Sequence, residues 1–308
     1  MTSPPRKILP WVALAIIYVV WGSTYMAIRI VVRELPPMAA AAFRFLVAGV
    51  VMSGMAAIAD RRHGWPSRRQ WADYALVGVL LLAVGNGLVM WSEKRIPSSI
   101  AALIVGSTPV WLTLFDGFRA HGQRWTVRVW TGTLIGLLGV VLVARPEGGI
   151  DPGHWSSIFA LQAATLAWTA GTLYAQSVPR RLPLFTAAAI EMLAGALALI
   201  AISTLLGEDA SRFVSATRDA WLGLAYLTVF GSLVGFTAFA YCINELPAST
   251  VGTYAYVNPV IAVFLGAMFL GERVTSGLIA GGALILVAVL FTTMGKRAAP
   301  AVAAPEQA

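Results

Sequence analysis

The stretch at residues 95–112, RIPSSIAALIVGSTPVWL, returns at residues 245–263 as ELPASTVGTYAYVNPVIAV. Each copy carries two prolines at the same spacing. The correspondence continues along the chain through Pro97 and Pro247, Pro109 and Pro259, Gly85 and Gly235, Trp21 and Trp168, and the triplets 122–124 and 271–273. Because the offset stays between 147 and 150 residues, the pattern indicates an internal duplication.

The composition is that of a membrane protein. Hydrophobic residues make up 58% of the chain and charged residues 12%, with a mean hydropathy of +0.76. Soluble domains contain about 25% charged residues. The formal net charge of +8 lies in short segments between apolar runs, so it indicates membrane topology rather than a nucleic-acid partner.

Residue counts also exclude several kinds of chemistry. Cys242 is the one cysteine, so no intramolecular disulfide can form. The histidines, His63, His121 and His154, fall in or beside predicted loops, and we expect no metal site or catalytic dyad at membrane depth. The chain lacks a P-loop motif, which argues against ATP hydrolysis. We therefore predict no cofactor and no enzymatic activity.

Ten apolar runs are long enough to cross a bilayer as helices, which takes about 20 residues. The runs are 10–32, 38–59, 72–92, 98–118, 127–144, 155–177, 184–206, 220–243, 248–270 and 275–294. The first run follows Arg6 and Lys7 and is too long for the apolar core of a cleaved signal peptide. We interpret it as an uncleaved first span.

Five runs fall in each half, and an odd number makes the two halves enter the membrane in opposite directions. We therefore predict an all-α integral membrane protein of ten transmembrane helices in two inverted-topology repeats, residues 8–145 and 154–294. Residues 295–308 are expected to be a disordered cytoplasmic tail. Lys and Arg number 13 on one side and 8 on the other, which places both termini in the cytoplasm.

Several stretches in order resemble one family. They are WGSTYMAIR (21–29), PPMAAAAFRFLVAG (36–49), AVGNGLVMWSE (83–93), PSSIAALIVGSTPVW (97–111) and YAYVNPVIAVFLGAMFLGE (254–272). Together they resemble the drug/metabolite transporter superfamily, its EamA-type exporters, and among these the YedA-like branch. The resemblance implies ten helices, a central cavity, alternating access, and export of amino acids and other small metabolites. Gln123 departs from the family's usual Gly-Glu-Arg triplet.

Two prolines predict broken helices at membrane depth. Pro109 and Pro259 fall near the middle of the fourth and ninth runs, at matching positions. A proline removes one backbone hydrogen bond, and such a break survives in a membrane only where other groups satisfy the freed carbonyls. Ser107, Thr108 and Asn258 lie beside the breaks and can do so. Paired interruptions favour a transporter site, and the alternative is a kink kept for packing.

Aromatic and amide side chains at a similar depth suit a mostly apolar cavity with a few placed polar groups. The residues predicted to line it are Trp21, Ser23, Tyr25, Arg44, Asn86, Trp168, Tyr174, Tyr254 and Asn258. For each aromatic residue the alternative is anchoring at the membrane interface, where Trp and Tyr are enriched. Trp21, Asn86, Trp168 and Asn258 are the strongest candidates, because they lie deeper or at repeat-matched positions.

Arg44 and Glu191 carry opposite charges at equivalent positions of the two halves. Their predicted depths differ by roughly 10 Å in a core of about 30 Å, which argues against a direct ion pair. Arg44 either extends toward the outer surface or faces the cavity to hold a carboxylate or the kinked backbone. Glu191 either couples transport to protons or, as a neutral acid, hydrogen-bonds a neighbouring helix.

The leading hypothesis is a secondary transporter that exports small metabolites, such as amino acids, across the inner membrane. The alternative is a non-transporting scaffold or a lipid-flipping partner, with a cavity open sideways to lipid. An intramembrane enzyme is disfavoured, since no cluster of catalytic residue types falls at one depth. The expected partners are a small-molecule substrate and the lipid bilayer. The G-x-x-x-G pairs Gly132/Gly136 and Gly277/Gly281 predict a helix seam or a homodimer face.

Overall fold

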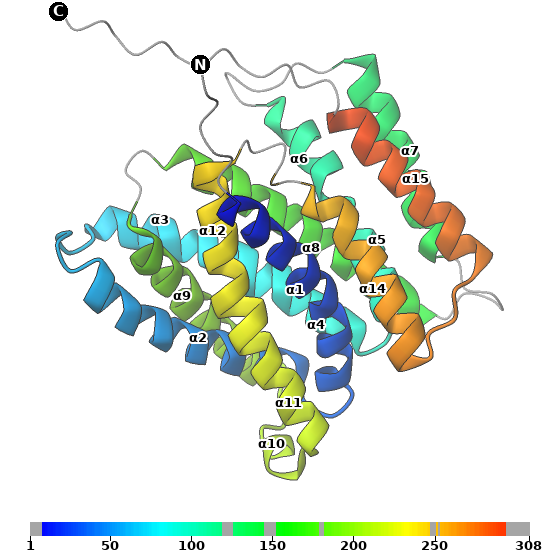
Figure 1. Ribbon diagram of the computed structural model, residues 1–308. Coiled ribbons are helices and arrows are strands. Elements are labelled where there is room, and N and C mark those ends of the chain that lie inside the picture. The colour runs from blue at the N-terminus through cyan, green and yellow to red at the C-terminus, as the bar shows by residue number, and fades with distance from the viewer. Residues whose placement is uncertain are drawn as a thin grey trace, which may run out of the picture.

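The computed structural model describes residues 8–118, 126–144, 152–178, 182–246, 251 and 253–293. Every regular element in these ranges is a helix (Figure 1). The stretches long and apolar enough to cross a membrane are Leu9–Val32, Pro37–Ala59, Arg68–Glu93, Ser98–Asp116, Leu184–Leu205 and Arg218–Phe239. Shorter apolar helices cover Val127–Val143, Val257–Leu270 and Ser276–Phe291. The chain is therefore an all-helical integral membrane protein.

The first half begins with α1 (Leu9–Val32) and α2 (Pro37–Ala59). A continuous helical stretch follows, formed by α3 (Arg68–Gly78), the π-helix η1 (Val79–Asn86) and α4 (Gly87–Glu93). The run predicted at 98–118 is two helices, α5 (Ser98–Val105) and α6 (Thr108–Asp116), with Gly106 and Ser107 between them. The last helix of this half is α7 (Val127–Ala144).

The second half repeats this order. It begins with α8 (Pro152–Ser177) and α9 (Leu184–Leu205), followed by the short α10 (Arg212–Ser215). A second continuous stretch contains α11 (Arg218–Tyr226), the π-helix η2 (Leu227–Val234) and α12 (Gly235–Glu245). The chain continues with α14 (Tyr254–Leu270) and α15 (Ser276–Thr293). The tail predicted at 295–308 lies outside the described residues.

Local sequence sets several helix ends. Pro10 and Pro37 stand in the first turns of α1 and α2, where a missing N–H leaves no bond unmade. Ser67 caps α3: its hydroxyl accepts from the N–H of Gln70, whose side chain accepts from the N–H of Ser67. Gly271 ends α14 at a φ of 66°, a left-handed conformation that glycine adopts without strain.

Repeat-equivalent helices pair at opposite edges of the molecule. α2 packs along α9 at one edge, and α7 packs along α15 at the other (Figure 1). Gly139 and Gly281 make the second pairing close, because a Cβ on Gly139 would lie 2.8 Å from the carbonyl oxygen of Gly281. Of the predicted glycines, Gly136, Gly277 and Gly281 also face this seam between α7 and α15. A homodimer through these helices stays a prediction.

Between the edges, each half inserts a helix into the other. α1 packs against α14, α12 and α11, whereas α8 packs against η1, α4 and α6 (Figure 1).

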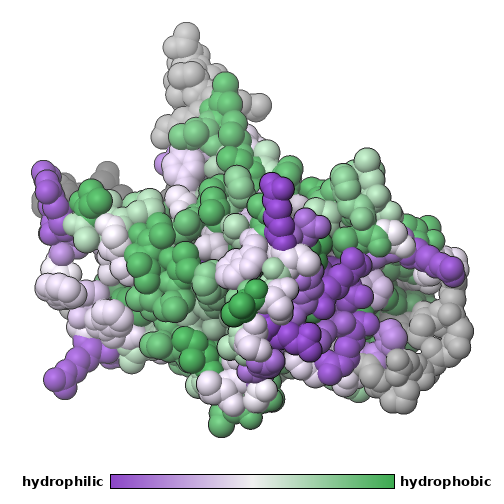
Figure 2. Space-filling model, turned by 90° about the horizontal axis from the view of Figure 1, so that it is seen from below, coloured by the Kyte–Doolittle hydropathy of each residue, from purple (hydrophilic) through white to green (hydrophobic). Residues whose placement is uncertain are grey.

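The outer side chains are largely apolar, and Figure 2 shows hydrophobic residues over much of one face, with hydrophilic residues gathered in patches. Exposed Val19, Val50 and Phe264 belong to this apolar exterior, as expected of helices in contact with lipid.

Carboxylates that follow one helix bind the N-terminus of its counterpart in the other half. Asp60, after α2, accepts hydrogen bonds from the N–H of Thr186 at 2.9 Å and from its hydroxyl at 2.8 Å, at the start of α9. Glu208, after α9, accepts from the N–H groups of Met38 at 3.2 Å and Ala39 at 2.8 Å, at the start of α2. Each carboxylate satisfies donors that a helix leaves free and complements its dipole.

Two further helices receive caps from distant carboxylates. Glu272, after α14, accepts from the N–H and hydroxyl of Ser98 at 2.7 and 2.8 Å, and from those of Ser99 at 3.0 and 2.6 Å. Glu34, after α1, accepts from the N–H and hydroxyl of Thr217 at the start of α11. These bonds lower the pKa of the Glu34 carboxyl, because they favour its ionised form. The helix ends of each half are therefore completed by the other half.

Candidate functional site

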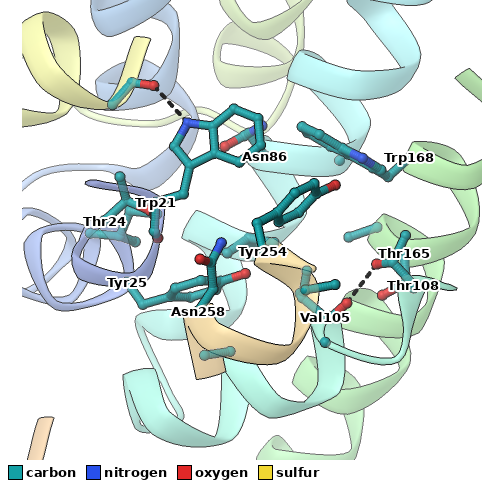
Figure 3. A pocket seen from close by; sticks show the side chains of 18 of the residues that line it. Trp21, Thr24, Tyr25, Asn86, Val105, Thr108, Thr165, Trp168, Tyr254 and Asn258 are labelled. Carbon is teal, nitrogen blue, oxygen red and sulfur yellow. Dashed lines mark hydrogen bonds between the residues drawn. The ribbon is translucent and has the colours of Figure 1, made fainter. Parts of the chain in front are cut away.

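A cavity lies at the junction of the two halves and contains about 860 Å³ of space free of protein atoms, part of it open to the outside. Side chains from α1, α5, α8 and α14 face one another across it (Figure 3). The predicted residues that line it are Trp21, Tyr25, Arg44, Asn86, Trp168, Tyr254, Asn258 and Pro259.

Four other predicted residues do not line this cavity. Ser23 is buried, and its hydroxyl lies 2.7 Å from that of Tyr226 on α11. Tyr174, near the end of α8, donates a hydrogen bond to Asp73 at 2.7 Å. Pro109 stands in the first turn of α6, and Glu191 lies where α9 packs against α3. We find no ion pair between Arg44 and Glu191 in the described part of the chain, where Arg44 donates to Ser232 instead.

The two helix interruptions meet beside the cavity. The first break lies at Gly106 and Ser107, so Pro109 begins a new helix and costs no bond there. Pro259, in contrast, lies inside α14 and cannot donate to the carbonyl of Ala255. A Cβ on Gly106 would lie 2.8 Å from Cγ of Pro259, so the backbone of one break packs directly on the proline ring of the other.

The polar side chains predicted beside the breaks all donate hydrogen bonds to backbone carbonyls. The hydroxyl of Ser107 donates to the carbonyl of Ile104 at 2.6 Å, and that of Thr108 donates to the carbonyl of Val105 at 2.5 Å. The amide of Asn258, in the orientation that satisfies both its ends, donates to the carbonyl of Tyr254 at 3.1 Å and to that of Tyr18 on α1 at 3.2 Å. At the first break the hydroxyl of Thr108 thus satisfies the carbonyl of Val105, whereas the bonds of Asn258 go to Tyr254 and Tyr18 rather than to Ala255.

The paired π-helices were not predicted. η1 and η2 occupy equivalent positions of the two halves, and both border the cavity through Gly85, Asn86 and Gly231. A π-helix bonds each N–H to the carbonyl five residues back, and such segments occur frequently at functional sites. The side-chain amide of Asn86 donates to the carbonyl of Leu81 at 3.3 Å within this irregular region. Hydropathy does not distinguish a π-helix from an α-helix. The matched glycines, Gly85 and Gly235, were the only feature of the sequence that marked these segments.

A tryptophan from the opposite half packs on each π-helix region. Nε1 of Trp21 on α1 donates to the carbonyl of Gly231 in η2 at 3.2 Å, and its ring packs on Gly235 (Figure 3). The ring of Trp168 on α8 packs on Gly85 of η1, where a Cβ would lie 3.3 Å from its Cε3. Tyr254 lies between the two tryptophans, 5.2 Å from the ring of Trp21 and edge-on to it (Figure 3). These three aromatic rings form a connected part of the cavity lining.

We expect Gly106→Ala to slow transport at least about fivefold while costing about 1–3 kcal/mol of stability. The new methyl group would meet the rigid ring of Pro259 and the carbonyls of Leu103 and Ala102, so α5 and α14 must separate at the cavity wall. The initial transport rate and the melting temperature of the purified variant test this. Gly54→Ala is the matched control, because nothing lies within 4 Å of that position. An unchanged rate in Gly106→Ala would contradict the role of this contact.

An all-helical membrane protein with broken helices around an inner cavity has the architecture of a membrane transporter. The comparisons with known proteins give the family. The model of the EamA-like transporter family matches residues 9–145 and 155–294, and the chain belongs to this family.

Relatives with similar sequences are named as transporters. The inner membrane transporter YedA of Escherichia coli strain K12 is 36% identical over 299 residues, which cover 96% of this chain and 94% of YedA. The transporter YvbV of Bacillus subtilis strain 168 is 25% identical, covering 94% of this chain and 93% of YvbV. One solved crystal structure matches with a TM-score of 0.65 at 20% identity, covering 92% of this chain and 96% of the other, and supports the fold alone.

Proposed function

We propose that this EamA-family protein is a secondary transporter that exports small metabolites, with amino acids and related compounds as the leading class. In this proposal ten spans form two inverted-topology repeats, residues 8–145 and 154–294, in the inner membrane with both termini in the cytoplasm. The cavity between the repeats opens alternately to the two sides. Transport is driven by an ion gradient or by the gradient of the substrate, since the sequence carries no P-loop.

The observation that carries this proposal is that both halves build the cavity in equivalent ways. Trp21 and Trp168, at matched positions, each pack on the π-helix region of the opposite half. Gly106 from the first half meets Pro259 from the second. A substrate held between these groups touches both repeats, and it is exposed to one side or the other when the repeats rock. The reciprocal caps of α2 and α9 support the same two-fold relation.

The direct test is export from liposomes. Purified protein is reconstituted into vesicles loaded with a mixed pool of amino acids and small metabolites, and release is followed by mass spectrometry with and without a pH gradient. Protein-free vesicles give the background leak. Release of a defined class of compounds above that leak supports the proposal. Absence of release by folded protein would favour the scaffold or lipid-flipping alternative, and labelled lipids in the same vesicles report flipping directly.

We expect Glu191→Gln to leave the protein folded and to remove the dependence of export on the pH gradient. The amide keeps the shape of the side chain but can neither take up nor release a proton. A carboxyl group inside an apolar span is energetically unfavourable, and such groups mark proton pathways. The same export assay measures the effect. Asp219→Asn, at the exposed start of α11, is the control for removing a carboxylate from the protein. Equal pH dependence in the Glu191 variant and wild type would return Glu191 to a structural role.

A further inference from the structure

The guanidinium of Arg44 lies buried at the cavity wall with donor capacity left over. Arg44 is 3% exposed and lines the cavity from α2. Its Nε donates to the hydroxyl of Ser232 at 2.8 Å, and its Cζ lies 4.7 Å from the ring centre of Phe45. Its Nη1 is buried without any acceptor. One edge of the guanidinium is therefore fixed, while the N–H groups of Nη1 have no partner.

The charge of Arg44 is not balanced by the protein around it. The structure contains no ion pair to Arg44 among the described residues, and the residues that line the cavity include no Asp or Glu. A buried cation without an anion is strongly destabilising, and so is a buried N–H without an acceptor. Natural proteins keep such groups mainly at functional sites, and inside membranes they mark pathways for substrates and ions.

Gly231 leaves room for the guanidinium group of Arg44 beside η2. A Cβ on Gly231 would lie 2.9 Å from Nη2 of Arg44 and 3.1 Å from Cγ2 of Thr24. Glycine at this position thus lets the guanidinium approach the backbone of η2, where Trp21 also binds the carbonyl of Gly231. The remaining lining is mostly apolar and aromatic, with Tyr254 between Trp21 and Trp168 (Figure 3).

We propose that Arg44 is the anion-recognition residue of the cavity and that the substrate is a small monocarboxylate with an apolar or aromatic body. The carboxylate accepts hydrogen bonds from the free Nη1 edge, and the body packs against the aromatic rings of Trp21, Tyr254 and Trp168. This inference rests on the proposed function, since it names the substrate class of that cavity. A phosphate group fits less well, because its higher charge would need more cations than Arg44, the one found among the described lining residues.

The proposal also states what is not recognised. Since the described lining carries no carboxylate, the cavity offers no ion pair to an ammonium group, and the aromatic faces are the alternative. An amine without a carboxyl group should therefore not bind. An amino acid binds through its carboxylate, and its amino group contributes little.

Four compounds of nearly equal shape test this: 3-phenylpropionate, its neutral amide 3-phenylpropanamide, phenylalanine and phenethylamine. Binding to the full-length protein in lipid nanodiscs is measured by calorimetry. The acid and phenylalanine should bind at least about tenfold more tightly than the amide and the amine, since one charge-assisted hydrogen bond corresponds to a 10- to 100-fold change. Comparable affinities for the acid and its amide, or no saturable binding of the acid, would overturn the proposal. Competition by inorganic phosphate at equal concentration would also overturn it.

Variants assign the effect to the guanidinium. Arg44→Gln should weaken binding of 3-phenylpropionate at least tenfold, and Arg44→Lys should restore only part of it. Gly231→Ala keeps the arginine and its charge but displaces the guanidinium, so it should also weaken binding of the acid and not of the amide. Arg95→Gln removes an exposed arginine that lies over Trp91 and serves as the control. If Arg44→Gln does not fold, Gly231→Ala decides. Wild-type affinity for the acid in a folded variant of either residue would refute the assignment.

The export assay separates this inference from the proposed function. Release of cations or neutral compounds, or equal release of carboxylates by wild type and Arg44→Gln, would leave an exporter and overturn the inference. Release of nothing would remove the proposed function, and the binding measurements in nanodiscs would still decide for or against the carboxylate site.

Discussion

Gly78→Leu is expected to destabilise the protein by more than about 3 kcal/mol and to abolish most of the folded yield. Gly78 is the point where α3 approaches the backbone of α9. A Cβ at this position would lie 2.6 Å from Cα and 2.7 Å from the carbonyl carbon of Glu191, and it would contact the carbonyl oxygen as well. Since these atoms belong to the backbone, no rotamer change can relieve the clash, and the two helices must separate.

The melting temperature in detergent and the fraction of monodisperse protein measure this effect. Gly54→Leu is the control, because Gly54 lies on α2 with nothing within 4 Å and its substitution adds apolar surface toward the exterior. Gly78→Ala should fall between the two. A Gly78→Leu variant as stable as Gly54→Leu would contradict the close approach of α3 and α9.

Glu272→Ala is expected to cost about 2–4 kcal/mol, with a corresponding fall in melting temperature and a loss of transport. The carboxylate accepts four hydrogen bonds from the backbone and hydroxyl groups of Ser98 and Ser99. Without it, the N-terminus of α5 loses its acceptors, and α5 carries Gly106 into the contact with Pro259. The effect should therefore extend from stability to the shape of the cavity.

Two further variants make this prediction specific. Glu272→Gln keeps an acceptor oxygen but loses the charge, so its melting temperature should lie between those of wild type and Glu272→Ala. Arg273→Ala changes the adjacent exposed residue and should leave stability unchanged. Equal melting temperatures for Glu272→Ala and Arg273→Ala would show that the cap does not stabilise α5.

The sequence predicted most of the long helices, because their hydropathy and proline spacing are local properties. α1, α2 and α9 begin and end within two residues of the predicted runs. The matched tryptophans, Trp21 and Trp168, both line the cavity. Local sequence does not identify the hydrogen-bond partner of a helix end when that partner lies far away in the chain. The cap of α5 by Glu272, 174 residues away from Ser98, has no signal in either segment.

Helix geometry explains why two of the predicted residues do not line the cavity. Successive residues turn by about 100° around a helix axis, so Ser23 projects about 200° away from Trp21, whereas Tyr25 shares its face. Ser23 accordingly turns to α11 and Tyr25 to the cavity. Tyr174 lies six residues beyond Trp168, about 9 Å further along the axis. The sequence-based prediction grouped these residues by depth in the membrane. Their angular positions around the helix axis would have separated Ser23 from Tyr25.

Two helices of the first half are capped by carboxylates that the ribosome adds only with the second half. The N–H of Met38 is separated by 170 residues from Glu208, and the N–H of Ser98 by 174 residues from Glu272. While the ribosome is still producing the second half, the beginnings of α2 and α5 have no protein acceptor. A nascent chain that ends before Glu208 therefore lacks the carboxylates that cap α2 and α5, and water is the remaining acceptor for those amide groups.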